Sequence, residues 1–232
     1  MIAQTKGAPE PETKERILRT AFQLFHEQGF HATGVATIVR EAGINPGSLY
    51  HFFESKDQLL LGVLEFSIGY LSPAVMEPVE SQNLDPIERI FALLKRYRDG
   101  MVRHGCRMGC PIGNLALEVS DGYPEARRLI HRNFENWAQR VEGWLMEAGD
   151  DLPKQLDRAR LAHFILTVME GGLMQARAAN DLKPFDESVA VLQEHLNLLL
   201  LQAAQAKDDQ SDGRTSKRSG MPRRKESSRR KR

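Results

Sequence analysis

Polar side chains able to form hydrogen bonds gather in one short segment, residues 33–53. Asn45, Ser48, Tyr50 and His51 lie within seven positions of one another and can each donate or accept a hydrogen bond. Groups of this kind bond to phosphate oxygens and to the edges of bases. A short helix that presents them outward can enter a DNA major groove, which is about 12 Å wide. We therefore predict that this segment contacts double-stranded DNA.

Two short helices and a tight turn must position these groups. Val35, Ile38 and Val39 recur at the i, i+3, i+4 spacing, which gives a short helix one apolar face. Gly43 follows where the chain must reverse, and glycine enters the left-handed conformation without a Cβ penalty. The first helix should therefore end near Gly43.

The second helix is predicted to start near Pro46. Asn45 is a favoured N-cap, and Pro46 fits the first helical position because no N–H is needed there. Leu49, Phe52 and Phe53 have the spacing of an inward face. The residues left on or near the outer surface are Asn45, Pro46, Gly47, Ser48, Tyr50 and His51.

Helices flank this pair on both sides. Residues 13–29 predict an amphipathic helix with Ile17, Ala21, Leu24 and Phe25 on its inner stripe. Residues 55–58 read Ser-Lys-Asp-Gln, the form of a capping box. A long connecting helix should run from Ser55 and end near residues 72–73.

The pattern across residues 13–59, about a fifth of the chain, resembles the TetR (TetR/AcrR) family of bacterial transcriptional regulators. The residues that carry the resemblance are Thr13, Ile17, Ala21, Phe25, Gly29, Phe30, Thr33, Ile38, Ala42, Gly43, Ile44, Gly47, Leu49, Tyr50, Phe53, Lys56, Asp57 and Leu59. It implies an all-helical homodimer. The N-terminal domains would bind operator half-sites, and the C-terminal domain would bind a small inducer.

By position, the resemblance implies DNA contacts for individual residues. Thr33 would touch a phosphate at the start of the first helix of the pair, while Tyr50 and Lys56 would hold phosphates. The residues that would face bases or the adjacent backbone are Asn45, Pro46, Gly47, Ser48 and His51.

Two positions depart from the family pattern. Gly34 stands where Ser or Thr is common, so capping there should fall to Thr33. Asn45 replaces the usual Ser or Thr at the start of the recognition helix. Asn can pair with adenine, but a capping side chain is committed to the backbone, and we favour the capping role.

The composition favours a cytoplasmic protein. Hydrophobic residues make up 41% of the 232 positions, enough for a core, and charges interrupt the apolar runs, so no membrane span is predicted. The N-terminus lacks the basic-then-apolar form of a signal peptide. Two cysteines, Cys106 and Cys110, argue against a disulfide scaffold and should be thiols in a reducing compartment.

The fold predicted is all-α. A flexible N-terminus (residues 1–10) precedes a three-helix DNA-binding domain at 11–71, whose helix-turn-helix spans 34–53, and a long helix joins it to a helical bundle at 72–204. Residues 85–88, Asp-Pro-Ile-Glu, form another capping box and should start a helix that ends near Arg103. Further helices are expected at about 112–119, from Pro124, at 155–179 and at 186–204.

The last two helices of the bundle are candidates for dimerisation. Residues 198–201 are four consecutive leucines, so apolar surface faces more than one direction and can meet a second subunit. The alternative is that both faces are buried within one subunit. Gly171 and Gly172 interrupt a helix, which suggests close approach by another backbone or a ligand, or else a simple kink. The candidate dimer residues are Leu161, Gly171, Gly172, Leu192, Leu196 and Leu199.

Large or adaptable side chains in the bundle are candidates for an inducer site, although ordinary core packing is the alternative for each. They are Met101, Cys106, Cys110, Trp137, Phe164 and Met169. Arg103, His104 and Arg107 lie near both cysteines, and a basic surround lowers a thiol pKa. Similar segments occur in TetR-type regulators that respond to electrophiles or oxidants, so sensing stays open beside a structural role. Metal binding is weakly indicated, because zinc usually needs four ligands.

Residues 205–232 form a basic tail predicted to be disordered. It holds 11 Lys or Arg and 4 Asp or Glu, a formal charge of +7 that leaves −6 on the rest of the chain. It has too few apolar residues to fold alone. It could be merely solvated, or it could attract DNA phosphates nonspecifically.

Motifs of common enzymes are missing: GxSxG, GxxxxGK[ST], HExxH and the dinucleotide glycine pattern. We therefore predict no catalytic residue, cofactor or metal site. The function predicted is a homodimeric repressor, released from a palindromic operator by an unknown small-molecule inducer. An activator, a sensor acting through Cys106 and Cys110, and a helical ligand-binding protein without DNA function are the alternatives.

Overall fold

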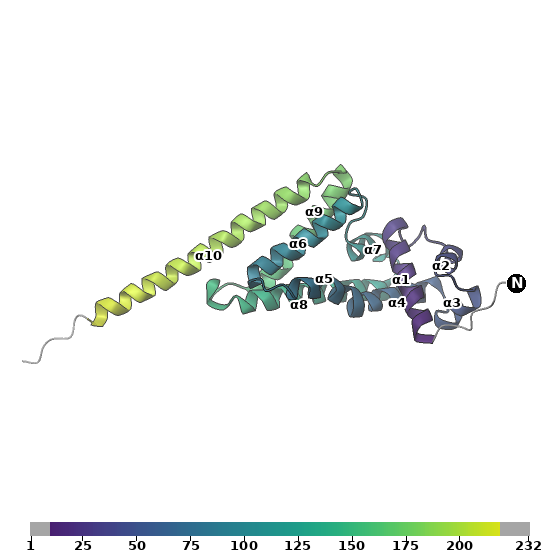
Figure 1. Cartoon of the computed structure of the whole chain (residues 1–232), viewed down its shortest axis with the longest axis horizontal. Helices are drawn as coiled ribbons and strands as arrows, with labels where there is room; N and C mark the ends of the chain where they lie inside the picture. The colour runs from purple at the N-terminus through teal and green to yellow at the C-terminus, as the bar shows by residue number, and fades with distance from the viewer. Residues whose placement is uncertain (1–9, 219–232) are drawn as a thin grey trace, which may run out of the picture.

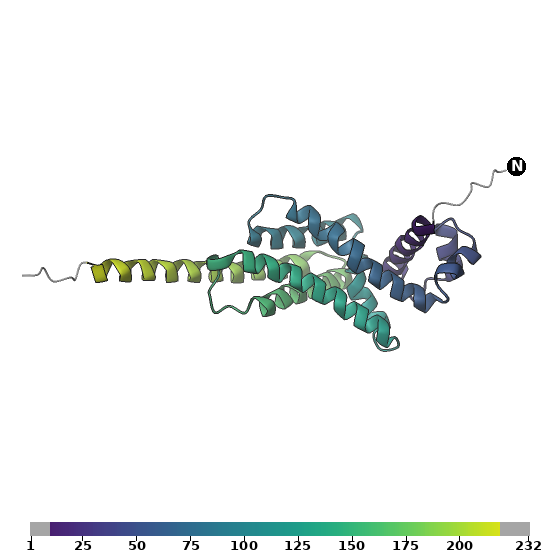
Figure 2. The same cartoon turned by 90° about the horizontal axis from the view of Figure 1, so that it is seen from below.

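The structure is a computed structural model that describes residues 10–218, which form helices and loops and contain no strand. The predicted all-α fold is confirmed. The helices, in chain order, are α1 (Glu10–Gln28), α2 (Val35–Glu41), α3 (Pro46–Phe52), α4 (Lys56–Phe66), α5 (Ser72–Glu80), α6 (Pro86–Arg103), α7 (Pro111–Val119), α8 (Pro124–Glu147), α9 (Arg158–Ala179) and α10 (Lys183–Arg218). The molecule is elongated, with α1–α3 at one end and the C-terminal part of α10 at the other (Figure 1, Figure 2).

The predicted helix starts are confirmed by side-chain caps. The Ser48 backbone N–H donates to Asn45 Oδ1 at 2.8 Å, and the Gln58 N–H donates to Ser55 Oγ at 3.1 Å. Asp85 completes the capping box of α6. Gly43 turns the chain between α2 and α3 with φ +61°, a conformation that costs other residues energy.

The N-terminal core is built on the predicted stripe of α1. Ile17, Ala21, Leu24 and Phe25 are all buried. Leu49 and Phe53 are buried against them, but Phe52 is only half-buried. The same core also receives Leu115 and Val119 of α7 and Ala126 and Ile130 of α8. Helices α1–α3 therefore share a hydrophobic core with helices that come from the bundle.

The helix from Ser55 does not end at residues 72–73 as predicted. A π-helical turn, Ser67–Leu71, follows α4, and α5 continues to Glu80. Pro73 lies in the first turn of α5. The wide turn before it gives room to a ring that would clash with the carbonyl four residues earlier in a regular helix.

This same run corrects the prediction about membrane spans. By length and composition alone, Lys56–Glu80 is long and apolar enough to cross a membrane, with a mean hydropathy of 1.6. Apolar residues of this run pack in the N-terminal core of the protein. They include Leu59, Leu60, Val63 and Leu64, which are buried.

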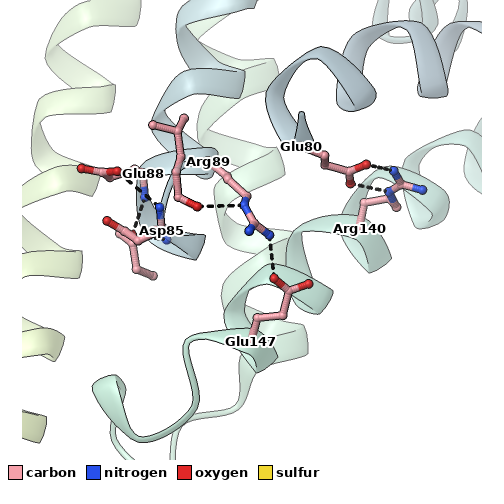
Figure 3. A network of polar contacts seen from close by, with 8 residues as sticks. Glu80, Asp85, Glu88, Arg89, Arg140 and Glu147 are labelled. Atoms are coloured by element: carbon pink, nitrogen blue, oxygen red, sulfur yellow. Dashed lines mark hydrogen bonds and ion pairs between the residues drawn. The ribbon is translucent and has the colours of Figure 1, made fainter. Parts of the chain in front are cut away.

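Ion pairs tie the helices of the bundle together. Figure 3 shows Arg140 of α8 paired with Glu80 of α5. It also shows Arg89 of α6 donating to Glu147 of α8. The distance between Arg89 Nη1 and Glu147 Oε2 is 2.6 Å. These pairs connect α8 to the helices on both sides of the α5–α6 loop.

The last helix is longer than predicted. It was expected to end near residue 204 but continues to Arg218, so residues 205–218 of the basic tail are helical. Most of these residues favour or tolerate a helix, and the single Gly213 costs only about 1 kcal/mol. Residues 219–232 lie outside the described part of the chain. The helical part of the tail points away from α3 of the same subunit (Figure 1, Figure 2).

Candidate DNA interface and ligand cavity

The surface of α3 presents the residues that the sequence indicated. Asn45, Pro46, Gly47 and His51 are exposed, and Tyr50 is 53% exposed. Asn45 has the capping role that we favoured, and its Oδ1 also accepts a hydrogen bond from Ser48 Oγ at 3.1 Å. Tyr50 and His51 are the large polar side chains exposed on this face.

Thr33 does not lie where the family pattern suggested. Its side chain is completely buried, and Thr33 Oγ1 donates to the carbonyl oxygens of Gly29 at 2.6 Å and Leu24 at 3.3 Å. The N-cap of α2 is Gly34, which makes no side-chain cap. The predicted phosphate contact and cap of Thr33 are therefore wrong. Its hydroxyl fixes the turn between α1 and α2.

Lys56 is bound to the same turn. Its Nζ lies 4.3 Å from the centroid of the Phe30 ring and 3.4 Å from the His31 carbonyl oxygen. Burial lowers the pKa of Lys56 from its ordinary value. A phosphate contact by Lys56 stays a prediction, and it would require a different side-chain conformation.

Glu118 of α7 links the bundle to this turn, and the sequence analysis missed it. Its carboxylate accepts hydrogen bonds from the backbone N–H groups of Phe30 at 2.8 Å and His31 at 2.6 Å. Tyr123 packs its ring edge-on to Phe30. A second link comes from His26 of α1, whose Nε2–H donates to the Gly109 carbonyl oxygen at 2.8 Å just before α7.

A cavity of about 230 Å³ lies where α1 meets the bundle. Its walls come from α1, the π-helical turn and α5–α9. The lining residues are Phe22, His26, Ser67, Val75, Met76, Tyr97, Cys110, Pro111, Ile112, Asn133, Phe134, Trp137, Leu166, Met169 and Glu170. A bound molecule here would touch α1 and the start of α7 at once.

Half of the predicted ligand residues line this cavity. Cys110, Trp137 and Met169 do, whereas Met101 and Cys106 are buried in the bundle core beside it. Phe164 is 48% exposed on the outer side of α9. Phe164 does not line this cavity, so its predicted role in a ligand site stays a prediction.

The polar chemistry of the cavity centres on Glu170, which the sequence analysis also missed. Burial raises the Glu170 pKa to about 7, although the hydrogen bond with the Cys110 thiol acts in the opposite direction. The basic residues near Cys110 in the sequence do not lower its pKa. Burial and then the nearby Glu170 carboxylate raise its pKa well above the ordinary value. A lone Glu within the apolar sequence of α9 was the available clue.

The predicted dimer residues lie largely inside the subunit. Leu161, Leu192, Leu196 and Gly172 are buried in the core between α9 and α10, so they cannot contact a partner and those predictions are wrong. A Cβ at Gly172 would lie 2.9 Å from the Phe185 ring, so the expected close approach comes from the same chain. Gly171 and Leu199 are half-buried. The exposed apolar residues of α9 and α10 are Phe164, Met174, Val191, Leu198 and Leu201.

The geometry defines a helix-turn-helix DNA-binding protein with a ligand-sized cavity behind the DNA-binding helices. Residues 17–63 match the family model "Bacterial regulatory proteins, tetR family". Residues 86–190 match "Transcriptional regulator LmrA/YxaF-like, C-terminal domain". The chain is 30% identical over 174 residues to YxaF of Bacillus subtilis (strain 168), an uncharacterized HTH-type transcriptional regulator, and the match covers 75% of this chain and 89% of YxaF. The chain belongs to the TetR family of bacterial transcriptional regulators and is a DNA-binding regulator.

Two further relatives agree with this assignment. The transcriptional repressor NemR of Escherichia coli (strain K12) is 24% identical, with 78% of this chain and 92% of NemR covered. The crystal structure of regulatory protein TetR from Rhodobacter sphaeroides superimposes with a TM-score of 0.71 at 25% identity, covering 79% of this chain and 98% of that one.

Proposed function

We propose that the protein is a homodimeric repressor that leaves a palindromic operator when a small molecule occupies the cavity. The observation that carries this proposal is the position of the cavity, which is lined both by Phe22 and His26 of α1 and by residues of the bundle. Repression is supported by the relative NemR, which is a transcriptional repressor. The protein would act in the cytoplasm, and its partners would be operator DNA, a second copy and the inducer.

On the DNA, α3 would lie in the major groove with Tyr50 and His51 toward the duplex. Tyr50 would hold a phosphate, and His51 would face bases together with the small residues Pro46 and Gly47. Phosphate contacts set the register of a protein on DNA, whereas contacts with base edges give sequence preference. Two subunits related by a twofold axis would require half-sites whose centres lie about 34–36 Å apart, or a multiple of that distance.

The dimer would form through the outer faces of α9 and α10. Phe164, Met174, Val191, Leu198 and Leu201 are exposed apolar residues on these two helices. Isolated exposed leucines are common, but a set of large apolar side chains along two adjacent helices is typical of an interface. In a twofold dimer the same patch is used by both copies.

Ligand binding would act on DNA affinity through α1 and α7. A ligand can shift the protein only if it prefers one arrangement over another. Contact with Phe22 and His26 would move α1, while contact with Pro111 and Ile112 would move α7 and, with it, the Glu118 link to Phe30 and His31. Either movement would change the separation of the two α3 helices in a dimer.

Sensing of electrophiles or oxidants through Cys110 is a weaker second function. Cys110 lines the cavity, but its raised pKa keeps the thiol protonated and unreactive at neutral pH. If sensing occurs, Cys110→Ser or Cys106→Ser will abolish release from DNA by thiol-reactive compounds. Normal release in both single variants and in the double variant will exclude it.

Selection of bound oligonucleotides from a random pool tests the proposed function. The proposal predicts a palindrome with the half-site spacing given above, and a gel shift with the DNA upstream of the protein's own gene. A reporter under that promoter should be repressed, and activation instead would exclude a repressor. Enrichment of no sequence would exclude operator binding.

A further inference from the structure

We propose that the inducer is a compact aromatic molecule carrying a protonated amine, which Glu170 receives as its counter-ion. This inference rests on the proposed function, since it names the class of ligand for the same cavity. The proposed ligand is a cation. A neutral alcohol and an anion of the same size are both predicted to bind poorly.

The walls of the cavity select against anions. Among its lining residues no Lys or Arg is present, and the one acidic side chain is Glu170. Burial lowers the pKa of His26, although its hydrogen bond to the Gly109 carbonyl acts in the opposite direction, so His26 favours its neutral form at pH 7. A carboxylate or phosphate ligand would therefore meet a carboxyl group with no opposing charge, at a large desolvation cost.

Glu170 has an oxygen without a partner. Glu170 Oε1 is buried and accepts no hydrogen bond from any residue that the structure describes. Its other oxygen, Oε2, lies against the backbone of α7, since a Cβ at Gly113 would be only 2.2 Å from it. Buried polar atoms are normally hydrogen-bonded, so the free oxygen indicates that a donor is to arrive from a ligand.

The aromatic lining favours a cation as that donor. Phe22, Tyr97, Phe134 and Trp137 surround the same cavity, and the negative face of an aromatic ring attracts a cation, more strongly once water is removed. The other titratable groups near Glu170 are neutral at pH 7. Burial raises the pKa of both Tyr97 and Cys110, and His26 is neutral for the reason given above.

A further polar atom of the lining, Trp137 Nε1, bears on the chemistry of the ligand. The Trp137 side chain is buried, and its Nε1–H lies near the Tyr97 hydroxyl, where it lowers the Tyr97 pKa, but makes no hydrogen bond of good geometry within residues 10–218. A ligand that also presents an oxygen or ring nitrogen acceptor would satisfy it. The volume of about 230 Å³ compares with about 30 Å³ for one water molecule in the liquid, so it accommodates one or two rings.

Calorimetry with three probes of equal size tests the charge. We expect 1-naphthylmethylamine to bind at least about 30-fold more tightly than 1-naphthalenemethanol, from the cost of removing one partner of a buried charge pair. We expect 1-naphthoate not to bind. Affinity for the amine should rise between pH 6 and pH 8, because Glu170 ionises in that range and only the carboxylate attracts the cation.

The variant Glu170→Gln keeps the shape of the side chain and removes its charge. It should bind the amine and the alcohol with similar affinity, and binding of both shows that the cavity is intact. The control Glu125→Gln, at an exposed site on α8, should keep the full preference. Equal binding of amine and alcohol by the parent would overturn the inference, and so would an unchanged preference in Glu170→Gln.

Operator binding, measured in parallel, separates the two proposals. If the amine binds through Glu170 but never weakens operator binding, the ligand class stands and induction through this cavity fails. If neutral aromatic molecules release the operator while the amine does not bind, the ligand class fails and the proposed function stands.

Discussion

The Glu118 carboxylate accepts a hydrogen bond from the backbone N–H of Phe30, although 88 positions separate the two residues. The other carboxylate oxygen of Glu118 accepts a second hydrogen bond, from the His31 N–H at 2.6 Å, so both oxygens bind the turn. Glu118 lies on α7, which begins at the cavity, and Phe30 lies in the turn that leads to the DNA-binding helices. A shift of α7 therefore reaches that turn through two charge-assisted hydrogen bonds, which are stronger than neutral ones.

Replacing Glu118 with Ala should loosen this turn. Two backbone N–H groups lose their acceptor, and an unsatisfied, partly buried donor costs about 1–3 kcal/mol. Hydrogen exchange should show faster exchange of the Phe30 and His31 amides, and urea denaturation should show a lower free energy of unfolding. The exposed Glu125→Ala on the neighbouring helix should change neither. Unaltered exchange at both amides in Glu118→Ala would mean that the link does not hold the turn.

Thr33→Val should reduce stability without altering charge-based DNA contacts. The substitution keeps the shape but removes the hydroxyl that donates to the Gly29 and Leu24 carbonyls. A lost hydrogen bond of this kind costs about 1 kcal/mol, which urea denaturation can measure. A stable variant whose DNA affinity has a weaker dependence on salt would instead support the phosphate contact that we rejected.

Local features were predictable from the sequence because their causes lie within a few residues. Asn45 and Pro46 start α3, and Asp85 with Glu88 starts α6, since a cap joins a side chain to a backbone group two or three positions away. The inner stripe of α1 follows from helical spacing alone. The end of the helix beyond Pro73 was not predictable from local rules, because the π-helical turn before it depends on tertiary packing.

The ligand cavity was not predictable in the same way. Phe22 and Glu170 both line it, but only the packing of α1 against the bundle brings residues so far apart in sequence together. Helical spacing showed that the leucines of α10 face two directions without showing which direction is outward. Leu192 and Leu196 were therefore predicted to form the dimer interface, whereas the structure buries both and leaves Val191 and Leu198 exposed.

Two leucines of α10 should separate dimerisation from folding. Leu198 is 65% exposed and Leu196 is fully buried. Leu198→Glu should yield monomers in sedimentation velocity while it retains the parent's helical content. Leu196→Ala should lower the free energy of unfolding by about 2–5 kcal/mol, because it leaves a cavity in the core. If Leu198→Glu still forms dimers at the same concentration as the parent, the dimer interface does not include Leu198.

The protonation of Glu170 should make stability depend on pH. Its pKa rises from 4.5 to about 7 on folding, so the folded state binds more protons than the unfolded state between these values. The contribution of Glu170 is therefore fully favourable below pH 4.5 and is lost as the pH rises through about 7, by about 3 kcal/mol in all. The free energy of unfolding of the parent, minus that of Glu170→Gln, should be smaller at pH 8 than at pH 5. An identical pH dependence in both proteins would contradict the burial of an ionisable carboxyl.

The most direct measurement of the central claim is operator affinity for variants of the α3 face, by fluorescence anisotropy on the selected site and on altered sites. Tyr50→Ala should weaken binding to all sequences alike, and His51→Ala should lose discrimination between bases worth about 1–3 kcal/mol. Arg128→Ala, at an exposed site on α8, should bind like the parent. If the Tyr50 and His51 variants both keep the parent's affinity and preference, α3 does not read the operator and the account is wrong.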